Sequence, residues 1–264
     1  MKLCCTSYSF DRAISEGEMS LRDFYQFCQE AGVEGIELWD LHLPDSPDGK
    51  FVEETKQELR AVGLPLATIA VNNHKFASLN ASERARDVAK IQCWIDVVSS
   101  LNCSVLRVLP GELKALNTHR ATRYPLVRAA FEECLPYAQA HGVTLAVENC
   151  PREAQPEVVV DLIKDLNTPF LRACPDIGNS PQAVRYRAWE DAAPFAVHVH
   201  AKTFDFDDRG EETTIDYSRA IGILKKSGYK GYLSIEFEGD GDEIVGVQKS
   251  IHLARRHLGA GGGD

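Results

Sequence analysis

The stretch Val143–Cys150 reads VTLAVENC. Its β-branched and apolar residues predict a buried strand, and that strand ends on a carboxylate, Glu148. The same order, an apolar strand followed at once by an oxygen or imidazole donor, recurs three times further along the chain. The later copies are 170–174 before Asp176, 195–197 before His198 and His200, and 232–235 before Glu236.

The donors that follow these strands form a candidate metal site. Parallel strands end at the same face of a sheet, so side chains that are distant in sequence can meet there. The four candidates are Glu148, Asp176, His200 and Glu236. Together they supply three carboxylates and one imidazole, which Mn²⁺, Mg²⁺ or Zn²⁺ accept as ligands. Each residue alone could instead cap a strand or form an ion pair, but four donors at successive strand ends favour one divalent-metal site.

Composition narrows the class of protein. The chain has 264 residues, a length that α/β barrels reach as one domain, and its net charge of −10 argues against nucleic-acid binding. Eight cysteines are scattered without CxxC spacing, which is typical of reduced thiols in a cytoplasmic protein. The N-terminus lacks the pattern of a signal peptide, and no apolar run is long enough to span a membrane. We therefore expect a cytoplasmic protein without a membrane segment.

Strand and helix patterns alternate along the whole chain at intervals of about thirty residues. Predicted strands cover 3–6, 33–39, 66–71, 105–109, 143–147, 170–174, 195–197 and 232–235. Helices are expected at 20–31, 82–101, 122–140, 156–166, 181–189, 216–227 and 243–257. One further helix, between the second and third strands, is expected to end at about residue 62. A serine cap is expected at Ser20, and glycines end helices at Gly32, Gly63, Gly142 and Gly228.

Eight strand-then-helix units without a linker predict an α/β fold with a single (β/α)₈ TIM barrel over residues 1–258. A doubly wound open sheet is the alternative. The barrel is favoured because ligands on four successive strands converge on one axis in a barrel and spread along an edge in an open sheet. The Gly-rich tail, 259–264, is expected to be disordered.

Several segments resemble the xylose-isomerase-like barrels of the sugar phosphate isomerase/epimerase superfamily. They are Ala31–Glu37, Leu145–Asn149, Cys174–Asn179, His198–Lys202 and Gly228–Glu236. The resemblance implies that the four candidate ligands bind one Mn²⁺ or Mg²⁺ ion, with Zn²⁺ or Co²⁺ as alternatives. It also implies that Glu148 and Glu236 move protons at a substrate carbon, as the matching glutamates do in ketose 3-epimerases. A metal that chelates a carbonyl and a neighbouring hydroxyl stabilises the enediolate formed when the intervening C–H loses its proton.

Two departures from the ketose epimerases leave a second reaction open. Those enzymes carry a histidine a few residues after the metal aspartate, where this chain has Ile177–Asn179, and an arginine soon after the metal histidine, where this chain has Lys202. Lys202 could bind an anionic group or protonate a leaving hydroxyl. That role would suit β-elimination from a keto-sugar, keto-glycoside or keto-inositol.

Further candidates follow other strands. His74, after the third strand, is a candidate acid alongside Lys202, although a loop histidine bonded to backbone is an equal alternative. The candidate substrate-binding residues are Glu37, Trp39, Arg107, Arg152 and His198. Each of these residues also has a structural alternative. Glu37 could form a buried ion pair, and Arg107 could pair with Glu37 or Glu148. Arg152 could lie on the surface, His198 could support the metal site, and Trp39 could pack at the rim of the barrel.

The leading hypothesis is a metal-dependent isomerase or epimerase that abstracts a proton next to a carbonyl of a sugar, keto-sugar or sugar acid. A metal-dependent lyase or dehydratase, which shares the first proton removal, is the alternative. An abasic-site endonuclease with three zinc ions is disfavoured by the acidic balance and the small number of histidines, and the complete ligand set disfavours a non-catalytic subunit. The expected partner is a small carbohydrate, and a homo-oligomer is compatible with the sequence.

Overall fold

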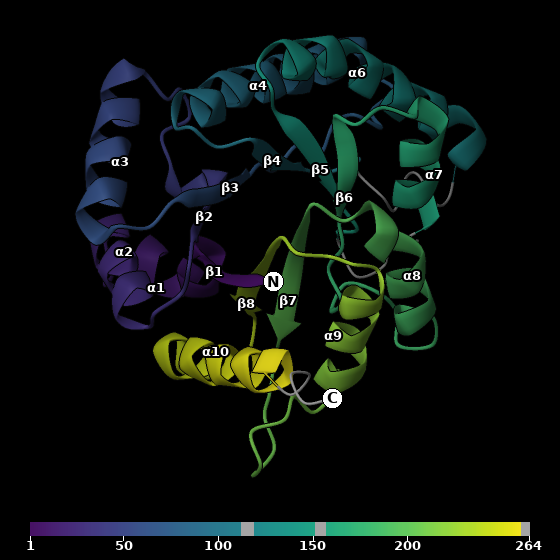
Figure 1. Cartoon of the computed structure of the whole chain (residues 1–264). Coiled ribbons are helices and arrows are strands. Elements are labelled where there is room, and N and C mark those ends of the chain that lie inside the picture. The colour runs from purple at the N-terminus through teal and green to yellow at the C-terminus, as the bar shows by residue number, and fades with distance from the viewer. Residues whose placement is uncertain (112–118, 151–156, 260–264) are drawn as a thin grey trace.

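A computed structural model of the protein describes residues 1–111, 119–150 and 157–259. Eight parallel strands form one sheet, and helices surround it as a ring (Figure 1). The strands are β1 Lys2–Thr6, β2 Ile36–Trp39, β3 Leu66–Ala70, β4 Val105–Val108, β5 Thr144–Glu148, β6 Leu171–Cys174, β7 His198–Thr203 and β8 Tyr232–Phe237. Arg152 and residues 260–264 lie outside the described residues, so the predictions made for them are not addressed by the structure.

The sheet curls into a barrel. Its order is β6-β5-β4-β3-β2-β1-β8-β7, so the first strand pairs with both the second and the last. Two parallel bridges, Ala173 to Ala196 and Asp176 to His200, join the β6 and β7 sides and nearly close the ring. The prediction of a (β/α)₈ TIM barrel is confirmed. The doubly wound alternative is wrong because an open sheet would not bridge its two edge strands, here β6 and β7.

A helix follows each strand and covers the outside of the barrel. These helices are α2 Leu21–Glu30, α3 Gly49–Val62, α4 Ala81–Ser100, α6 Arg120–Ala140, α7 Glu157–Leu166, α8 Arg185–Ala192, α9 Tyr217–Lys226 and α10 Glu243–Gly259; α1 Asp11–Ser15 is a short addition after β1. Ser20 caps α2 in a capping box with Asp23, as its sequence position predicts. The four predicted helix-ending glycines all have φ between 65° and 76°, a range that favours glycine.

Three elements begin at least three residues later than the sequence indicates, and the first is β2, which starts at Ile36 and not at Val33. The predicted strand at 195–197 is wrong, because Ala193–Phe195 forms a 3₁₀ helix that contains Pro194, and β7 starts only at His198. The helix expected from Pro181 starts at Arg185, since a turn closed by the Val184 N–H and the Pro181 carbonyl comes first. The shift in β7 places both histidines and Lys202 within the strand.

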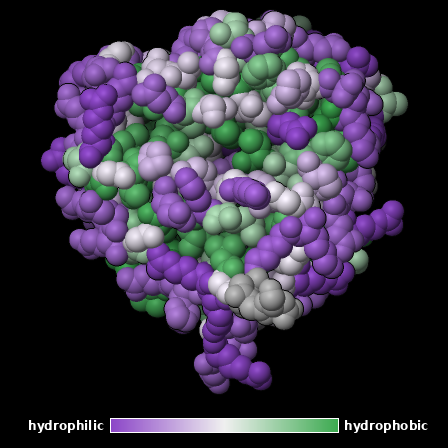
Figure 2. Space-filling view, viewed as in Figure 1, coloured by the Kyte–Doolittle hydropathy of each residue, from purple (hydrophilic) through white to green (hydrophobic). Residues whose placement is uncertain are grey.

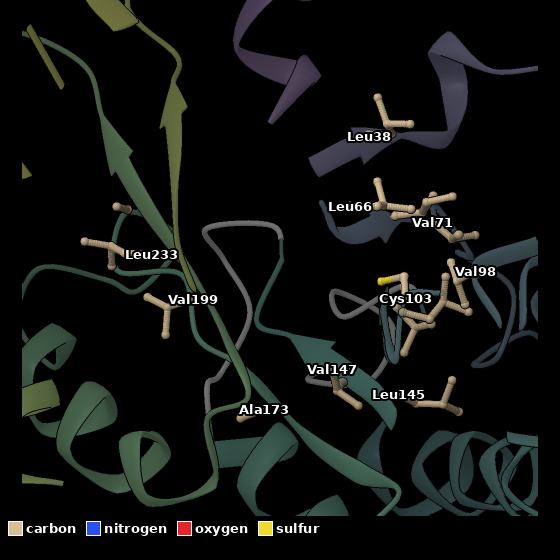
Figure 3. Packing of buried hydrophobic residues seen from close by; sticks show 14 of the residues in the cluster. Leu38, Leu66, Val71, Val98, Cys103, Leu145, Val147, Ala173, Val199 and Leu233 are labelled. Atoms are coloured by element: carbon tan, nitrogen blue, oxygen red, sulfur yellow. The ribbon is translucent and has the colours of Figure 1, made fainter. Parts of the chain in front are cut away.

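Strand residues alternate between the barrel interior and the layer beneath the helices. On β5, Leu145 and Val147 pack in the apolar core while Glu148 points inward, and on β7 the same holds for Val199 against His200. Figure 3 shows outward residues of this kind on β5, β6, β7 and β8: Leu145, Val147, Ala173, Val199 and Leu233. The apolar core therefore lies between strands and helices, which leaves the barrel interior for polar side chains.

One face of the molecule has a hydrophilic edge (Figure 2), and the cysteines form no disulfide bonds. Figure 2 shows hydrophilic residues around the periphery of one face, with hydrophobic residues in the gaps between them. All eight cysteines are free, and six of them are buried. None of the described helices combines the length and the apolar composition that crossing a bilayer requires.

Phe131 on α6 tests the packing of the outer core. Its side chain is fully buried and meets the ring of Phe76 edge-on, with centroids 5.1 Å apart. We expect Phe131→Ala to lower the free energy of unfolding by about 3–5 kcal/mol, since the substitution leaves a cavity. Leu79→Ala, in the same region but 67% exposed, is the control and should stay within about 0.5 kcal/mol of the parent. Urea unfolding measures both, and equal effects would contradict the assignment of this core.

Candidate metal centre

Glu37 accepts hydrogen bonds from both histidines of the site. Its carboxylate lies 2.6 Å from His198 Nε2 and 3.0 Å from His200 Nε2, and its side chain is fully buried. A carboxylate only accepts hydrogen bonds, so each Nε2 carries the proton and donates it to Glu37. This arrangement leaves Nδ1 of His200 with a free lone pair. Carboxylates fix the tautomer of metal-binding histidines in the same way.

The free nitrogen of His200 points at two carboxylates. Its Nδ1 lies 2.9 Å from Glu236 Oε2 and 3.6 Å from Glu148 Oε1. His200 Nδ1 and Glu236 Oε2 are both buried, and neither makes a hydrogen bond with the described residues. A lone pair that faces a carboxylate oxygen in a buried site requires a cation or a proton between them.

Asp176 completes the set from β6. Its Oδ1 accepts hydrogen bonds from the backbone N–H groups of Gly178 and Asn179, and its Oδ2 accepts one from Asn179 Nδ2 at 2.8 Å. The bridge between Asp176 and His200 sets these two residues side by side. Ligand atoms of Glu148, Asp176 and His200 all lie within 4.8 Å of one another. This spacing suits one shared ion.

Arg107 and Asn179 hold Glu148 in place. The guanidinium of Arg107, on β4, donates through Nε and a terminal nitrogen to Glu148 Oε2, and Asn179 Nδ2 donates to Oε1 at 3.0 Å. Burial opposes ionisation of Glu148, but the charge of Arg107 outweighs it and lowers the pKa of Glu148 to about 2. Glu148 is therefore a fixed carboxylate anion at neutral pH.

Lys202 lies among the acidic groups on the inner face of β7. Its Nζ is 2.9 Å from Asp176 Oδ2, 3.2 Å from Glu236 Oε1 and 3.0 Å from Glu238 Oε1. The ammonium is thus within hydrogen-bond reach of two candidate ligands. Lys202 is 2% exposed, so its charge acts inside the site and not on the surface.

The buried cluster has an excess of negative charge that a divalent cation would neutralise. Four buried carboxylates face two permanent cations, so two negative charges remain uncompensated; the carboxylates are Glu37, Glu148, Asp176 and Glu236, and the cations are Arg107 and Lys202. The excess is visible at Asp176, where burial and the charges of Glu236 and Glu148 outweigh Lys202 and raise the pKa to about 7. The donor set, the unpartnered atoms and the charge all fit a divalent metal ion.

The remaining predicted residues lie around this cluster in different roles. Glu37 and Arg107 are buried and bonded to the candidate ligands His200 and Glu148, and the buried His198 is bonded to Glu37. We propose that these three residues position the ligands and do not contact substrate. Trp39 is half-buried, with its ring edge-on to Tyr8 at 4.8 Å. His74 lies on the loop after β3, where partial desolvation and the charge of Arg107 lower its pKa.

Two residues of the site are absent from the sequence-based set of candidates. Asn179 bonds both Glu148 and Asp176, and Glu238 bonds Lys202. The signal for Glu238 is the strand period of two, which places it on the same face as Glu236. No pattern marks Asn179, since its role depends on the turn after β6.

The fold and the site together define a class: a (β/α)₈ barrel with a buried carboxylate and histidine cluster at the C-terminal ends of its strands. The chain belongs to the family described as xylose isomerase-like TIM barrel, whose sequence profile matches residues 25–257.

Comparison with known proteins extends this assignment. The chain is 40% identical over 68 residues to the C-glycoside deglycosidase alpha subunit of Arthrobacter globiformis, a match that covers 26% of this chain and 19% of that protein. The chain thus matches about a fifth of the length of that relative. Among solved structures, a D-tagatose 3-epimerase-like protein superimposes with a TM-score of 0.76 at 21% identity, covering 98% of this chain and 97% of the other. A 3-keto-D-glucoside 4-epimerase from E. coli superimposes with a TM-score of 0.72 at 15% identity, covering 97% and 99%. At these identities the two structures share the fold.

Glu37→Gln tests the positioning role of this residue. The amide of glutamine is neutral and has only one acceptor oxygen, so it cannot accept hydrogen bonds from both histidines as the carboxylate does. His200 then loses its fixed tautomer. We expect affinity for Mn²⁺ to fall roughly 10- to 100-fold while the fold is retained. Titration calorimetry measures the affinity, with Glu30→Gln on the exposed face of α2 as the control. Unchanged affinity in Glu37→Gln would show that Glu37 does not support the metal centre.

Proposed function

We propose that the protein is a divalent-metal-dependent sugar isomerase or epimerase. It removes a proton from the carbon next to a carbonyl of a sugar, keto-sugar or sugar acid. The observation that supports this most is the environment of His200, whose Nε2–H is held by Glu37 and whose Nδ1 faces Glu148 and Glu236. With Asp176 beside it, this donor set suits Mn²⁺ or Mg²⁺, with Zn²⁺ or Co²⁺ as alternatives.

The chain's own residues divide the proton transfers between them. When bound, the ion supplies Lewis-acid polarisation of the substrate carbonyl. Glu236 is the base that we assign to the first proton removal, because its Oε2 has no hydrogen-bond partner among the described residues. Glu148, which Arg107 holds as an anion, is assigned to the second transfer; it first takes up a proton from water, and Glu236 releases its own proton to water. Return of the proton to the opposite face of the same carbon gives epimerisation, and return to the neighbouring carbon gives isomerisation.

Deuterium exchange tests this proposal. The metal-loaded protein is incubated in D₂O with ketoses, 3-keto-glycosides, keto-inositols and sugar acids, and the recovered sugars are analysed by NMR. We expect deuterium at the carbon next to the carbonyl of at least one substrate, with an epimer or isomer as product. If the ion binds and no substrate in the panel exchanges, the proposed function is wrong and a binding subunit becomes the better interpretation.

A lyase is the second candidate, and Lys202 favours it. Its ammonium lies 3.2 Å from Glu236 Oε1, so a proton donor sits beside the proposed base. After Glu236 removes the proton, Lys202 can protonate a leaving oxygen on the next carbon, which completes a β-elimination from a keto-sugar, keto-glycoside or keto-inositol. The local similarity to a C-glycoside deglycosidase alpha subunit is also compatible with cleavage of a sugar substituent.

Lys202→Met separates the two reactions. If Lys202 protonates a leaving group, we expect formation of the elimination product to fall roughly 10²- to 10⁴-fold while deuterium exchange stays within roughly tenfold of the parent. Both are measured by NMR in the same reaction, with Lys226→Met on the exposed end of α9 as the control. A parallel loss of exchange and elimination would show that Lys202 supports the whole site and not the leaving group.

A further inference from the structure

A large cavity lies beside the candidate metal centre. Its volume is about 1080 Å³, and its walls come from the loops that follow β6, β7 and β8 together with the start of α10. The loop after β7 extends beyond the ring of helices at the lower edge of Figure 1 and forms a hydrophilic projection in Figure 2. These three loops follow the strands that carry Asp176, His200 and Glu236, so the cavity opens on the same end of the barrel as the metal centre.

Two residues connect the cavity to the reaction centre. Glu238 lines the cavity and lies 3.0 Å from Lys202 Nζ, which in turn lies 2.9 Å from Asp176 Oδ2. Gly178 also lines it and packs on Lys202, since a Cβ there would come within 2.6 Å of the lysine side chain. The Lys202 side chain therefore lies between a wall of the cavity and the candidate ligand Asp176. A substrate bound at the centre can extend into the cavity.

One wall of the cavity is aromatic. Phe204, Phe206 and Phe237 line it, and the rings of Phe206 and Phe237 stack with centroids 6.5 Å apart and planes 19° from parallel. Gly246 makes room for this arrangement, because a Cβ there would lie 2.3 Å from the Phe237 ring. Phe204 and Phe206 are only half-buried, so part of their surface faces the cavity. Such surfaces favour aromatic or flat apolar ligands.

The polar groups of the cavity are mainly acidic. Four carboxylates line it, from Asp205, Glu238, Asp240 and Asp242. Of the two lining cations, Arg185 donates to the backbone carbonyls of Ser180 and Thr214 and is 7% exposed, which leaves Lys249 at the wall. This balance disfavours a phosphate group and suits hydroxyl donors.

We propose that this cavity is a subsite for an aromatic, hydroxyl-bearing group attached to the sugar, so that the substrate is an aryl glycoside and not a free or phosphorylated sugar. This inference rests on the proposed function, because it takes the sugar to bind at the metal centre. Pockets that enclose drug-sized ligands have volumes of about 300–1000 Å³, so the cavity is large enough for such a substituent.

Binding of non-reacting glycosides tests the subsite without chemistry. We would titrate 4-hydroxyphenyl β-D-glucoside, methyl β-D-glucoside and glucose 6-phosphate by calorimetry, with and without Mg²⁺. We expect the aryl glucoside to bind at least about tenfold more tightly than the methyl glucoside, and glucose 6-phosphate to gain nothing. Because these glycosides do not turn over, the contrast in binding can fail while proton exchange on keto-sugars succeeds, and proton exchange can fail while the contrast holds.

Substitutions of the aromatic wall test whether the preference for the aryl glucoside arises in this cavity. Phe206→Ala should abolish the preference for the aryl glucoside, and Phe204→Ala serves as the second variant if Phe206→Ala does not fold. The matched control is Phe195→Ala, since Phe195 is also half-buried but precedes β7 and lies outside the cavity. The proposal is overturned if the two glucosides bind equally, if neither binds, if the preference survives both cavity variants, or if the control loses it as well.

Discussion

Glu236→Gln is expected to lower the rate of deuterium exchange roughly 10⁴-fold, the largest effect that we foresee on the chemistry. The substitution keeps the shape of the side chain but removes the basic oxygen that faces His200 Nδ1 at 2.9 Å. An amide is not a base, and a positioned base contributes roughly 10²- to 10⁴-fold to the rate. The loss of one negative charge next to the proposed ion adds to the effect.

The control for this variant is Glu190→Gln on the exposed side of α8, which has the same change of charge away from the site. Exchange is followed by NMR at saturating metal, so that weaker binding of the ion does not hide the loss of the base. If Glu236→Gln exchanges within tenfold of the parent, another group removes the proton and the assignment of Glu236 is wrong.

Asp176→Asn is expected to weaken Mn²⁺ binding by at least roughly 100-fold, more than loss of the supporting Glu37. The parent cluster has two uncompensated negative charges, and the variant keeps one. The new amide would also direct N–H donors toward Asn179 Nδ2 or Lys202, which now donate to the carboxylate. Calorimetric titration with Mn²⁺ measures the change, and Asp191→Asn, exposed on α8, is the control. Parent-like affinity in Asp176→Asn would place the ion elsewhere.

Much of the barrel follows from local sequence signals. The strand Thr144–Glu148, the Ser20 cap and the helix-ending glycines depend on near neighbours in the chain, and all appear in the structure at or within a residue of their predicted places. The start of β7 does not, because Pro194 favours a 3₁₀ turn over the apolar run Phe195–Val197. The local sequence alone does not show whether the 3₁₀ turn or the strand is more stable, because that depends on the packing of the surrounding elements.

The polar interior of the barrel is less accessible from sequence. Strand alternation indicates that Glu37, His198 and His200 point inward, but the 161-residue separation between Glu37 and His198 means that only barrel closure brings them together. Arg107 had two possible partners, and the register of β4 beside β5 selects Glu148. The positions of the candidate ligands at strand ends were thus predictable, and the hydrogen-bond partners of each group were not.

Anomalous X-ray scattering from crystals grown with Mn²⁺ tests the central claim most directly. The account predicts one ion per chain within the cluster, bound by Glu148, Asp176, His200 Nδ1 and Glu236, with Glu37 still bonded to His200 Nε2. An empty cluster at saturating Mn²⁺, with Lys202 remaining between Asp176 and Glu236, would contradict it.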